Sequence, residues 1–220
     1  MEASQTSAAS GDTARQSDAT PNDAQEAQLI TAAKAGNRTA FEDLFTTYES
    51  RIYRCGLRMM GTSDAAADIL QEVALRMYRY LGQFEGRSRF AAWVMAIAIN
   101  QCRMTLRNTR KERWMESLDA PVESEDGLIP QEVADWHPDP EQLYTNAELG
   151  SILTEALQQL SPTYREVFLL CDAEEYSMKE AAQILGLSVA AVKTRLHRAR
   201  LKLRQVLEKS FAKGSAATPA

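Results

Sequence analysis

Residues 176–204 read YSMKEAAQILGLSVAAVKTRLHRARLKLR, two short helical patterns separated by a glycine. Near the start, Ser177 is followed three residues later by Glu180, which is the form of a capping box. In such a pair each side chain accepts a hydrogen bond from the other residue's backbone amide. Because these amides have no partner inside the helix, we expect a helix to begin at Ser177.

Three further residues of this stretch are spaced as in a helix-turn-helix. Ala182 is small enough to let two helices approach, Gly186 turns the chain, and Val192 packs the second helix onto the first. Ser188 is placed to cap the second helix. The stretch therefore predicts a DNA-binding unit whose second helix enters the major groove.

The outer face of this second helix has the composition that nucleic-acid binding requires. With Val192 inward, steps of about 100° per residue put Leu196, Ala199 and Leu203 on the inner face. The outer face then carries side chains that can donate hydrogen bonds to base edges and nearby phosphates: Lys193, Thr194, His197 and Arg198. Around them lie basic side chains suited to the phosphate backbone: Arg195, Arg200, Lys202 and Arg204. The alternative is an ordinary solvated basic helix, on which His197 is exposed without touching DNA.

Charge is strongly segregated along the chain, although the net charge is only −5. Ten acidic residues and no Lys or Arg lie between Glu116 and Glu148, whereas eight Lys or Arg and two acids lie between Tyr176 and Lys209. Segments polarised in this way usually have different partners. The net negative charge therefore does not exclude nucleic-acid binding.

Changes in composition divide the chain into two ordered units. Large apolar side chains are almost absent from the first 27 residues, and four prolines interrupt the acidic segment. We predict a disordered tail at 1–27, a first unit at 28–114, an acidic flexible linker at 115–147, a second unit at 148–210 and a disordered tail at 211–220. Apolar residues recur at three and four positions in both units, which predicts an all-α fold of two small helical domains.

Two amphipathic helices are predicted in the first unit. One apolar stripe comprises Leu70, Val73, Ala74, Met77 and Leu81, and the next comprises Phe90, Trp93, Val94, Ile97 and Ala98. The loop between them contains two glycines, and Ser88 is placed to cap the helix that follows. Because Phe90 and Trp93 fall on the inner stripe, we expect them to pack in the core.

Several classes of protein find no support in the sequence. No run approaches the roughly 18 apolar residues of a membrane span, and the N-terminus lacks a secretory signal, so we expect a cytoplasmic protein. Cys55, Cys102 and Cys171 are interpreted as reduced core thiols, and neither His137 nor His197 stands in a ligand-like spacing. Without a phosphate loop, an activated nucleophile or a metal cluster, we predict a protein that is not an enzyme and needs no cofactor or metal.

Both units resemble parts of bacterial RNA polymerase sigma factors. Residues 160–204, and most specifically AVKTRLHRARLKLR, look like sigma region 4. The segments AFEDLFTTYESRIYRCGLRMMG, DILQEVALRMYRYLGQFEG and FAAWVMAIAINQCRMTLRNTRK are similar to region 2. With only a linker between them, the chain resembles the extracytoplasmic-function group of the sigma-70 family. The resemblance implies a factor that binds core RNA polymerase and directs promoter-specific initiation in a stress or environmental response.

For region 2, the resemblance implies contacts with polymerase and with the −10 element. The clamp helices of the largest polymerase subunit would meet Asp68, Gln71, Glu72, Leu75 and Arg76, although a solvated helix face is the alternative. Phe84, Arg87, Ser88 and Arg89 match the loop that captures a flipped −10 base, where stacking, hydrogen bonds and positive charge are needed. Asn100, Arg103 and Arg107 match the face that follows the −10 strand. At Met104 the family often has a polar or acidic residue, which leaves the −10 sequence preference open.

For region 4, the resemblance assigns Lys193, Thr194, His197 and Arg198 to the −35 element. The helices around residues 160–170 would meet the flap of the second-largest polymerase subunit. The linker would follow the path of nascent RNA, or would merely increase solubility. Members of this group often bind an anti-sigma factor. A stand-alone helix-turn-helix regulator is the alternative function, but no second apolar face for dimerisation is visible.

Overall fold

The computed structural model describes residues 23–116 and 146–215, and within these ranges every regular element is a helix. The first unit comprises α1 (Asp23–Lys34), α2 (Arg38–Met60), α3 (Ser63–Tyr80), the 3-10 turn η1 (Leu81–Gln83) and α4 (Phe90–Glu116). The second comprises α5 (Asn146–Gln158), α6 (Pro162–Phe168), the π-helical turn η3 (Leu169–Ala173), α7 (Met178–Leu185) and α8 (Val189–Ser215). The predicted all-α fold is confirmed for the described residues.

Capping residues set the ends of the two helices that build the first unit. The Asn37 side chain accepts a hydrogen bond from the Ala40 amide at 3.1 Å and so begins α2. Gly61 ends this helix with a φ of +86°, a left-handed conformation that glycine adopts without strain. Thr62 follows at once and caps α3. The tight turn makes α2 and α3 antiparallel neighbours.

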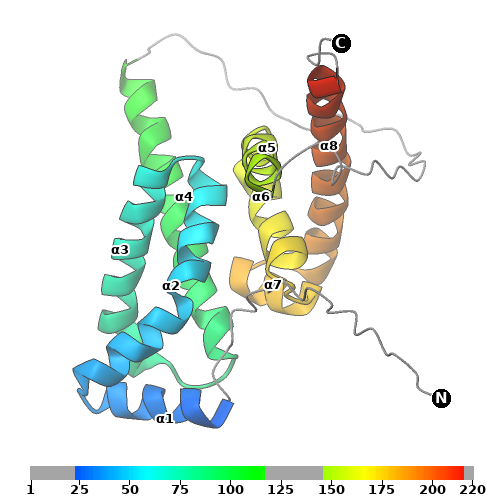
Figure 1. Cartoon of the computed structure of the whole chain (residues 1–220). Helices are drawn as coiled ribbons and strands as arrows, with labels where there is room; N and C mark the ends of the chain where they lie inside the picture. The colour runs from blue at the N-terminus through cyan, green and yellow to red at the C-terminus, as the bar shows by residue number, and fades with distance from the viewer. Residues whose placement is uncertain (1–22, 117–145, 216–220) are drawn as a thin grey trace, which may run out of the picture.

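The core of the first unit lies between α2, α3 and α4, while α1 lies across the foot of these helices (Figure 1). Fully or almost fully buried side chains include Leu44, Tyr48, Ile52, Ile69, Val73, Met77, Val94, Met95 and Ile99. Each large apolar side chain buried in this way contributes about 1.5–3 kcal/mol. The buried stripe of α3 is centred on Ile69, Val73 and Met77. It differs from the predicted stripe in that Leu70 is only half-buried.

The helix-turn-helix of the second unit has the predicted local geometry. Ser177 and Glu180 form both hydrogen bonds of the capping box, and Gly186 ends α7 with a φ of +66°. The Ser188 hydroxyl accepts a hydrogen bond from the Ala191 amide at 3.1 Å, so it caps α8. Val192 and Ala199 are fully buried, and Leu196 and Leu203 of the predicted inner face are almost fully buried.

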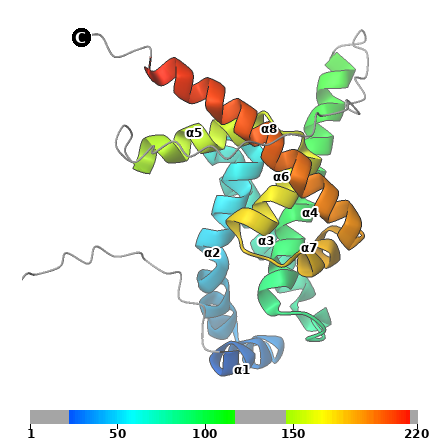
Figure 2. The ribbon, with the colours of Figure 1, turned by 90° about the vertical axis from the view of Figure 1, so that its right-hand side faces the viewer.

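The two units pack side by side rather than standing apart (Figures 1 and 2). Helix α4 lies against α7, and α2 lies against α5 and α6. Buried side chains from both units form one continuous apolar cluster. The second unit therefore covers one side of the first.

Some predicted boundaries differ from the structure. Helix α1 begins at Asp23, so residues 23–27 are not part of a disordered tail; the Tyr48 hydroxyl donates to the Glu26 carboxylate at 2.7 Å and fixes this turn. Helix α4 continues to Glu116 and α8 to Ser215, beyond the ends predicted for the two units at 114 and 210. Residues 1–22, 117–145 and 216–220, which include most of the predicted linker, lie outside the described residues.

Local contacts also correct the predicted cap of α4. The Arg89 carbonyl accepts a hydrogen bond from the Trp93 amide at 3.2 Å, so Arg89 and not Ser88 precedes the helix.

Cys55 and Cys102 are buried free thiols, as expected, and Cys171 is half-buried. None of the described helices is both long and apolar enough to cross a membrane.

Candidate nucleic-acid and polymerase interfaces

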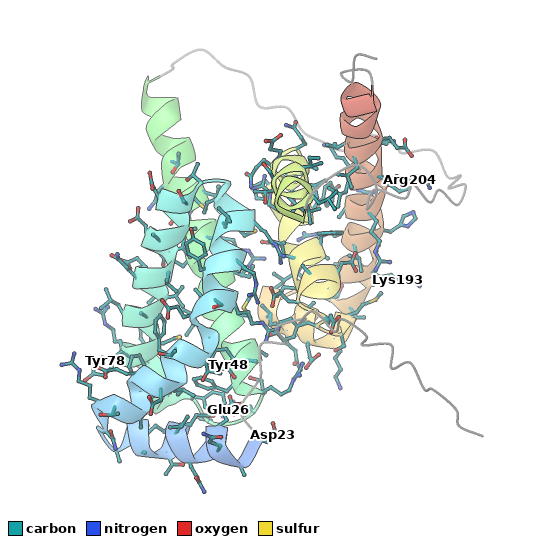
Figure 3. The ribbon with its side chains drawn as sticks, in the orientation of Figure 1. Asp23, Glu26, Tyr48, Tyr78, Lys193 and Arg204 are labelled. Atoms are coloured by element: carbon teal, nitrogen blue, oxygen red, sulfur yellow. The ribbon has the colours of Figure 1, made fainter. Side chains whose placement is uncertain are left out.

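The outer face of α8 is open and basic. Lys193, Thr194 and His197 are exposed, while Arg198 is half-buried and donates to the Tyr164 hydroxyl at 3.4 Å. Figure 3 shows Lys193 on the side of α8 that faces away from the first unit. The predicted groove-facing residues therefore lie together on an accessible surface.

A hollow between α6 and α8 adjoins this face. It is lined by Ser161, Thr163, Tyr164, Ala190, Ala191, Thr194, Arg195 and Arg198. Hydroxyls beside two guanidinium groups suit phosphate oxygens, because both can donate hydrogen bonds to them. Sequence reasoning missed the α6 hydroxyls, since nothing in their spacing showed that α6 lies beside the start of α8.

Further along α8, two of the arginines assigned to phosphates already have partners. Arg200 donates two hydrogen bonds to the Asp172 carboxylate, at 2.8 and 2.6 Å, and this contact raises the pKa of the guanidinium. Arg204 Nε lies 2.9 Å from Glu208 Oε1. These two residues are less available to DNA than the sequence suggested.

On α3, an exposed surface combines acidic and apolar side chains. Asp68, Gln71 and Glu72 are exposed, and so are Leu75 and Tyr78, at 59% and 68%. We call Asp68, Gln71, Glu72, Leu75 and Tyr78 the α3 face. Tyr78, which Figure 3 shows on the outer side of the first unit, was not predicted, although it stands three residues after Leu75 on the same helix.

Arg76 does not belong to this exposed surface. It is half-buried and donates to the Met104 sulfur at 3.8 Å, while its buried Nε has no hydrogen-bond partner. The side chain thus turns towards α4. Its predicted contact with polymerase would require this side chain to leave α4.

In the loop before α4, the charged side chains are exposed to solvent but the ring of Phe84 is not. Phe84 is only 8% exposed and packs against Phe90 and Trp93, with ring centroids 5.1 and 5.5 Å away. The ring faces the core, contrary to the predicted stacking on a base. Phe90 is buried and Trp93 half-buried, as expected. Arg87 and Ser88 are exposed in the loop.

Two of the arginines predicted to contact the −10 element are paired with the second unit. Arg89 Nε and Nη2 donate to Glu180 Oε1 at 2.9 and 2.5 Å. Arg103 Nε and Nη2 donate to Glu166 at 2.6 and 2.7 Å, and this hydrogen bonding raises the pKa of Arg103. Asn100 and Arg107 on the same helix are exposed.

Comparison with known proteins identifies the family of this chain. The models of "Sigma-70 region 2" and "Sigma-70, region 4" match residues 44–112 and 151–203. The chain is 35% identical over 180 residues to the ECF RNA polymerase sigma factor SigW of Bacillus subtilis, which covers 81% of this chain and 94% of that protein. The chain belongs to the ECF sigma factors.

Other relatives of this sigma factor agree with the assignment. RNA polymerase sigma factor CarQ of Myxococcus xanthus is 36% identical over 172 residues, 78% of this chain and 91% of that protein. The sigma factor RpoE of Bartonella quintana, solved in complex with the anti-sigma factor NepR, aligns with a TM-score of 0.56 and 26% identity over 76% of this chain and 96% of that one. The first and second units of this sigma factor are hereafter called region 2 and region 4.

Proposed function

We propose that this sigma factor binds core RNA polymerase through the α3 face, engages the −10 strand with α4 and its preceding loop, and reads the −35 duplex with α8. The protein directs initiation without catalysing a reaction itself. A cytoplasmic location is part of the proposal, because the protein would have to meet polymerase there. An anti-sigma factor is a further proposed partner, because the RpoE relative is bound to one.

The observation that carries the proposal is the outer face of α8. A helix-turn-helix of correct local geometry presents Lys193, Thr194 and His197 to solvent at the start of its second helix. Short polar and basic side chains at this position can reach base edges, and Arg195 lies beside them for phosphates. Arg198 adds a donor next to the α6–α8 hollow.

Core polymerase is the proposed partner of the α3 face. Leu75 and Tyr78 supply apolar anchors, and Asp68, Gln71 and Glu72 supply a polar rim. Interfaces between proteins commonly combine an apolar centre with a polar rim. The flap of the second-largest subunit is the proposed partner of α6, and the linker is proposed to follow the RNA path.

The −10 strand is proposed to contact Arg87, Ser88, Arg89, Asn100, Arg103 and Arg107. Single-stranded DNA binding needs positive charge along the backbone and donors for displaced bases. Phe84 is not part of this set, because its ring is buried. Its contribution is to hold the loop against α1, where Lys34 donates to the Phe84 carbonyl.

Transcription from mapped start sites tests the whole proposal. Purified protein is mixed with sigma-free core polymerase and a genomic promoter library, and discrete transcript starts are expected. The variant Lys193→Ala/His197→Ala should lose those starts, whereas Lys209→Ala, a charge change far along α8, should retain them. Specific DNA binding by the protein alone, with no starts when core polymerase is added, would contradict the proposal.

A further inference from the structure

The contact between the regions is electrostatically one-sided. Four arginines of region 2 pair with three glutamates of region 4: Arg51 and Arg58 with Glu174, Arg89 with Glu180, and Arg103 with Glu166. The shortest N–O distances are 2.5, 3.7, 2.5 and 2.6 Å in that order. We call Glu166, Glu174 and Glu180 the acidic face of region 4. This face lies within a domain whose DNA-binding helix is strongly basic.

The carboxylates of region 4 bind these arginines in the way that a DNA phosphate would bind them. Arg103 meets both oxygens of Glu166 through two parallel hydrogen bonds, and Glu166 is 1% exposed. Carboxylate and phosphate both accept such paired bonds from a guanidinium. A DNA phosphate can therefore reach Arg103 in the proposed manner only after Glu166 has left it.

Cation–π contacts add to the same interface. The Tyr176 ring of region 4 is buried, and the guanidinium groups of Arg51 and Arg89 lie 5.0 and 5.6 Å from its centroid. Cations at such distances are attracted to the face of an aromatic ring. The ring thus packs under two of the four paired arginines.

The end of α2 provides a second area of close contact with region 4. Arg165 of α6 donates to the Met59 carbonyl, and Gln158 of α5 donates to the Arg58 carbonyl at 2.9 Å. These carbonyls lie at the negative end of the α2 dipole. A Cβ at Gly61 would lie 2.8 Å from the Gln158 side chain, which shows how closely the two regions approach.

We infer that this arrangement is a closed resting form, in which the acidic face of region 4 occupies arginines of region 2 and competes with the −10 strand for them. The inference rests on the proposed function, because it uses the −10 assignment of Arg89 and Arg103. The outer face of α8 stays open in the closed form. Opening of the two regions therefore precedes −10 capture but not −35 contact.

Arginine reactivity in the full chain tests closure without DNA. Phenylglyoxal modification is followed by mass spectrometry at Arg51 and Arg103, whose side chains are 21% and 33% exposed, with Arg38 at 86% as the reference. The opening variant is Glu166→Gln/Glu174→Gln/Glu180→Gln, which removes charge without adding volume and keeps a Gln at the capping position. The control is Asp43→Asn/Glu49→Gln/Glu155→Gln, with the same charge change at exposed sites that leave the Arg38–Glu42 pair intact.

We expect Arg51 and Arg103 to react several-fold faster in the opening variant, with Arg38 unchanged and the control like the original protein. Rising salt should have the same effect on the original protein, because screening weakens partly exposed ion pairs; this measurement stands even if the variant folds poorly. Equal reactivity in all proteins and at all salt concentrations would overturn the inference and leave transcription by the factor untouched.

Strand binding completes the test. The probe is a fluorescein-labelled single strand copied from the non-template −10 region of a start mapped with this protein. If closure hides nine-tenths of the molecules, opening should raise the apparent affinity about tenfold. Faster arginine reactivity without tighter strand binding would overturn the proposed competition. It would show that Arg89 and Arg103 do not bind the −10 strand.

Discussion

Arg198 and Arg200 stand two positions apart on α8 but have different surroundings. Arg200 donates from Nε and Nη2 to both carboxylate oxygens of Asp172. Arg198 makes a long hydrogen bond to the Tyr164 hydroxyl beside the α6–α8 hollow. The two arginines carry the same charge, so we expect their local partners to decide how far each contributes to the proposed DNA contact.

Arg198→Ala should therefore weaken binding to the −35 duplex by about 1–3 kcal/mol if the side chain contacts a base. Arg200→Ala should have a smaller effect, because its guanidinium already pairs with Asp172. Fluorescence anisotropy of the full chain with cognate and scrambled −35 duplexes measures both. An equal loss for Arg198→Ala on the two duplexes would instead make Arg198 a phosphate contact.

For Phe84 we predict an effect on stability and not on DNA binding, because its ring is buried with Phe90 and Trp93. Phe84→Ala should lower the free energy of unfolding by about 3–5 kcal/mol, through lost burial and the cavity left behind. Urea denaturation measures this, with Arg87→Ala in the exposed loop as the control. Unchanged stability together with reduced opening of the −10 bubble would restore the stacking role.

At the scale of elements, the α3 face predicts a binding defect without a folding defect. Leu75→Ala/Tyr78→Ala should weaken core polymerase binding by about 2 kcal/mol or more if both side chains are central anchors. Both side chains are largely exposed, and the ring contact that is lost is that of Tyr78 with Phe41, so the melting temperature should fall by only a few degrees. Competition with a labelled sigma factor for core polymerase provides the measurement, with Glu49→Ala on α2 as the control. Undiminished competition would show that polymerase binds elsewhere.

The capping box of α7 gives a prediction that depends on pH. The pKa of Glu180 is lowered from its ordinary 4.5, first by the Ser177 hydroxyl and also by the Ser177 amide and Arg89. A lowered folded-state pKa means that the stabilisation is complete above pH 4.5 and is lost as pH falls through the lowered value. Ser177→Ala should move the Glu180 pKa back towards 4.5 and cost about 0.5–2 kcal/mol near neutral pH.

NMR titration of the Glu180 carboxyl carbon follows this shift, and urea denaturation at pH 7 and pH 3 follows the stability. The difference in stability between Ser177→Ala and the original protein should shrink at the lower pH. Thr46→Ala, which removes a hydroxyl at an exposed position of α2, is the control. A Glu180 titration that is the same in both proteins would contradict the assigned cause.

Local signals explain why some elements could be predicted and others not. The capping box, the turn at Gly186 and the inner face of α8 are encoded within one short stretch, and the structure has all three. Phe84 was misplaced because its ring packs on Phe90 and Trp93, and the loop pattern did not show that the chain folds back onto them. Arg76 was misplaced because it turns towards Met104, 28 positions away on α4. The pairing of Arg103 with Glu166 joins residues 63 positions apart, and no spacing rule reports such a contact.

For the whole molecule, charge and packing act together. The two regions share one apolar cluster, so neither buries its core entirely alone. Region 4 presents a basic face to solvent and the acidic face to region 2. The net charge of −5 therefore reflects neither the basic face that region 4 turns to solvent nor the acidic face that it turns to region 2. Whether DNA can reach each basic site depends on how the two regions are arranged.

This shared core predicts that the closed protein unfolds as one unit at low salt. Differential scanning calorimetry should show a single transition whose calorimetric and van't Hoff enthalpies agree. With the ion pairs removed in Glu166→Gln/Glu174→Gln/Glu180→Gln, the coupling between regions weakens and two transitions should appear. The control Asp43→Asn/Glu49→Gln/Glu155→Gln should keep one. High salt should separate the transitions of the original protein in the same direction, because partly exposed pairs are screened. Two resolved transitions in the original protein at low salt would show that the regions fold independently and that the interface contributes little to either.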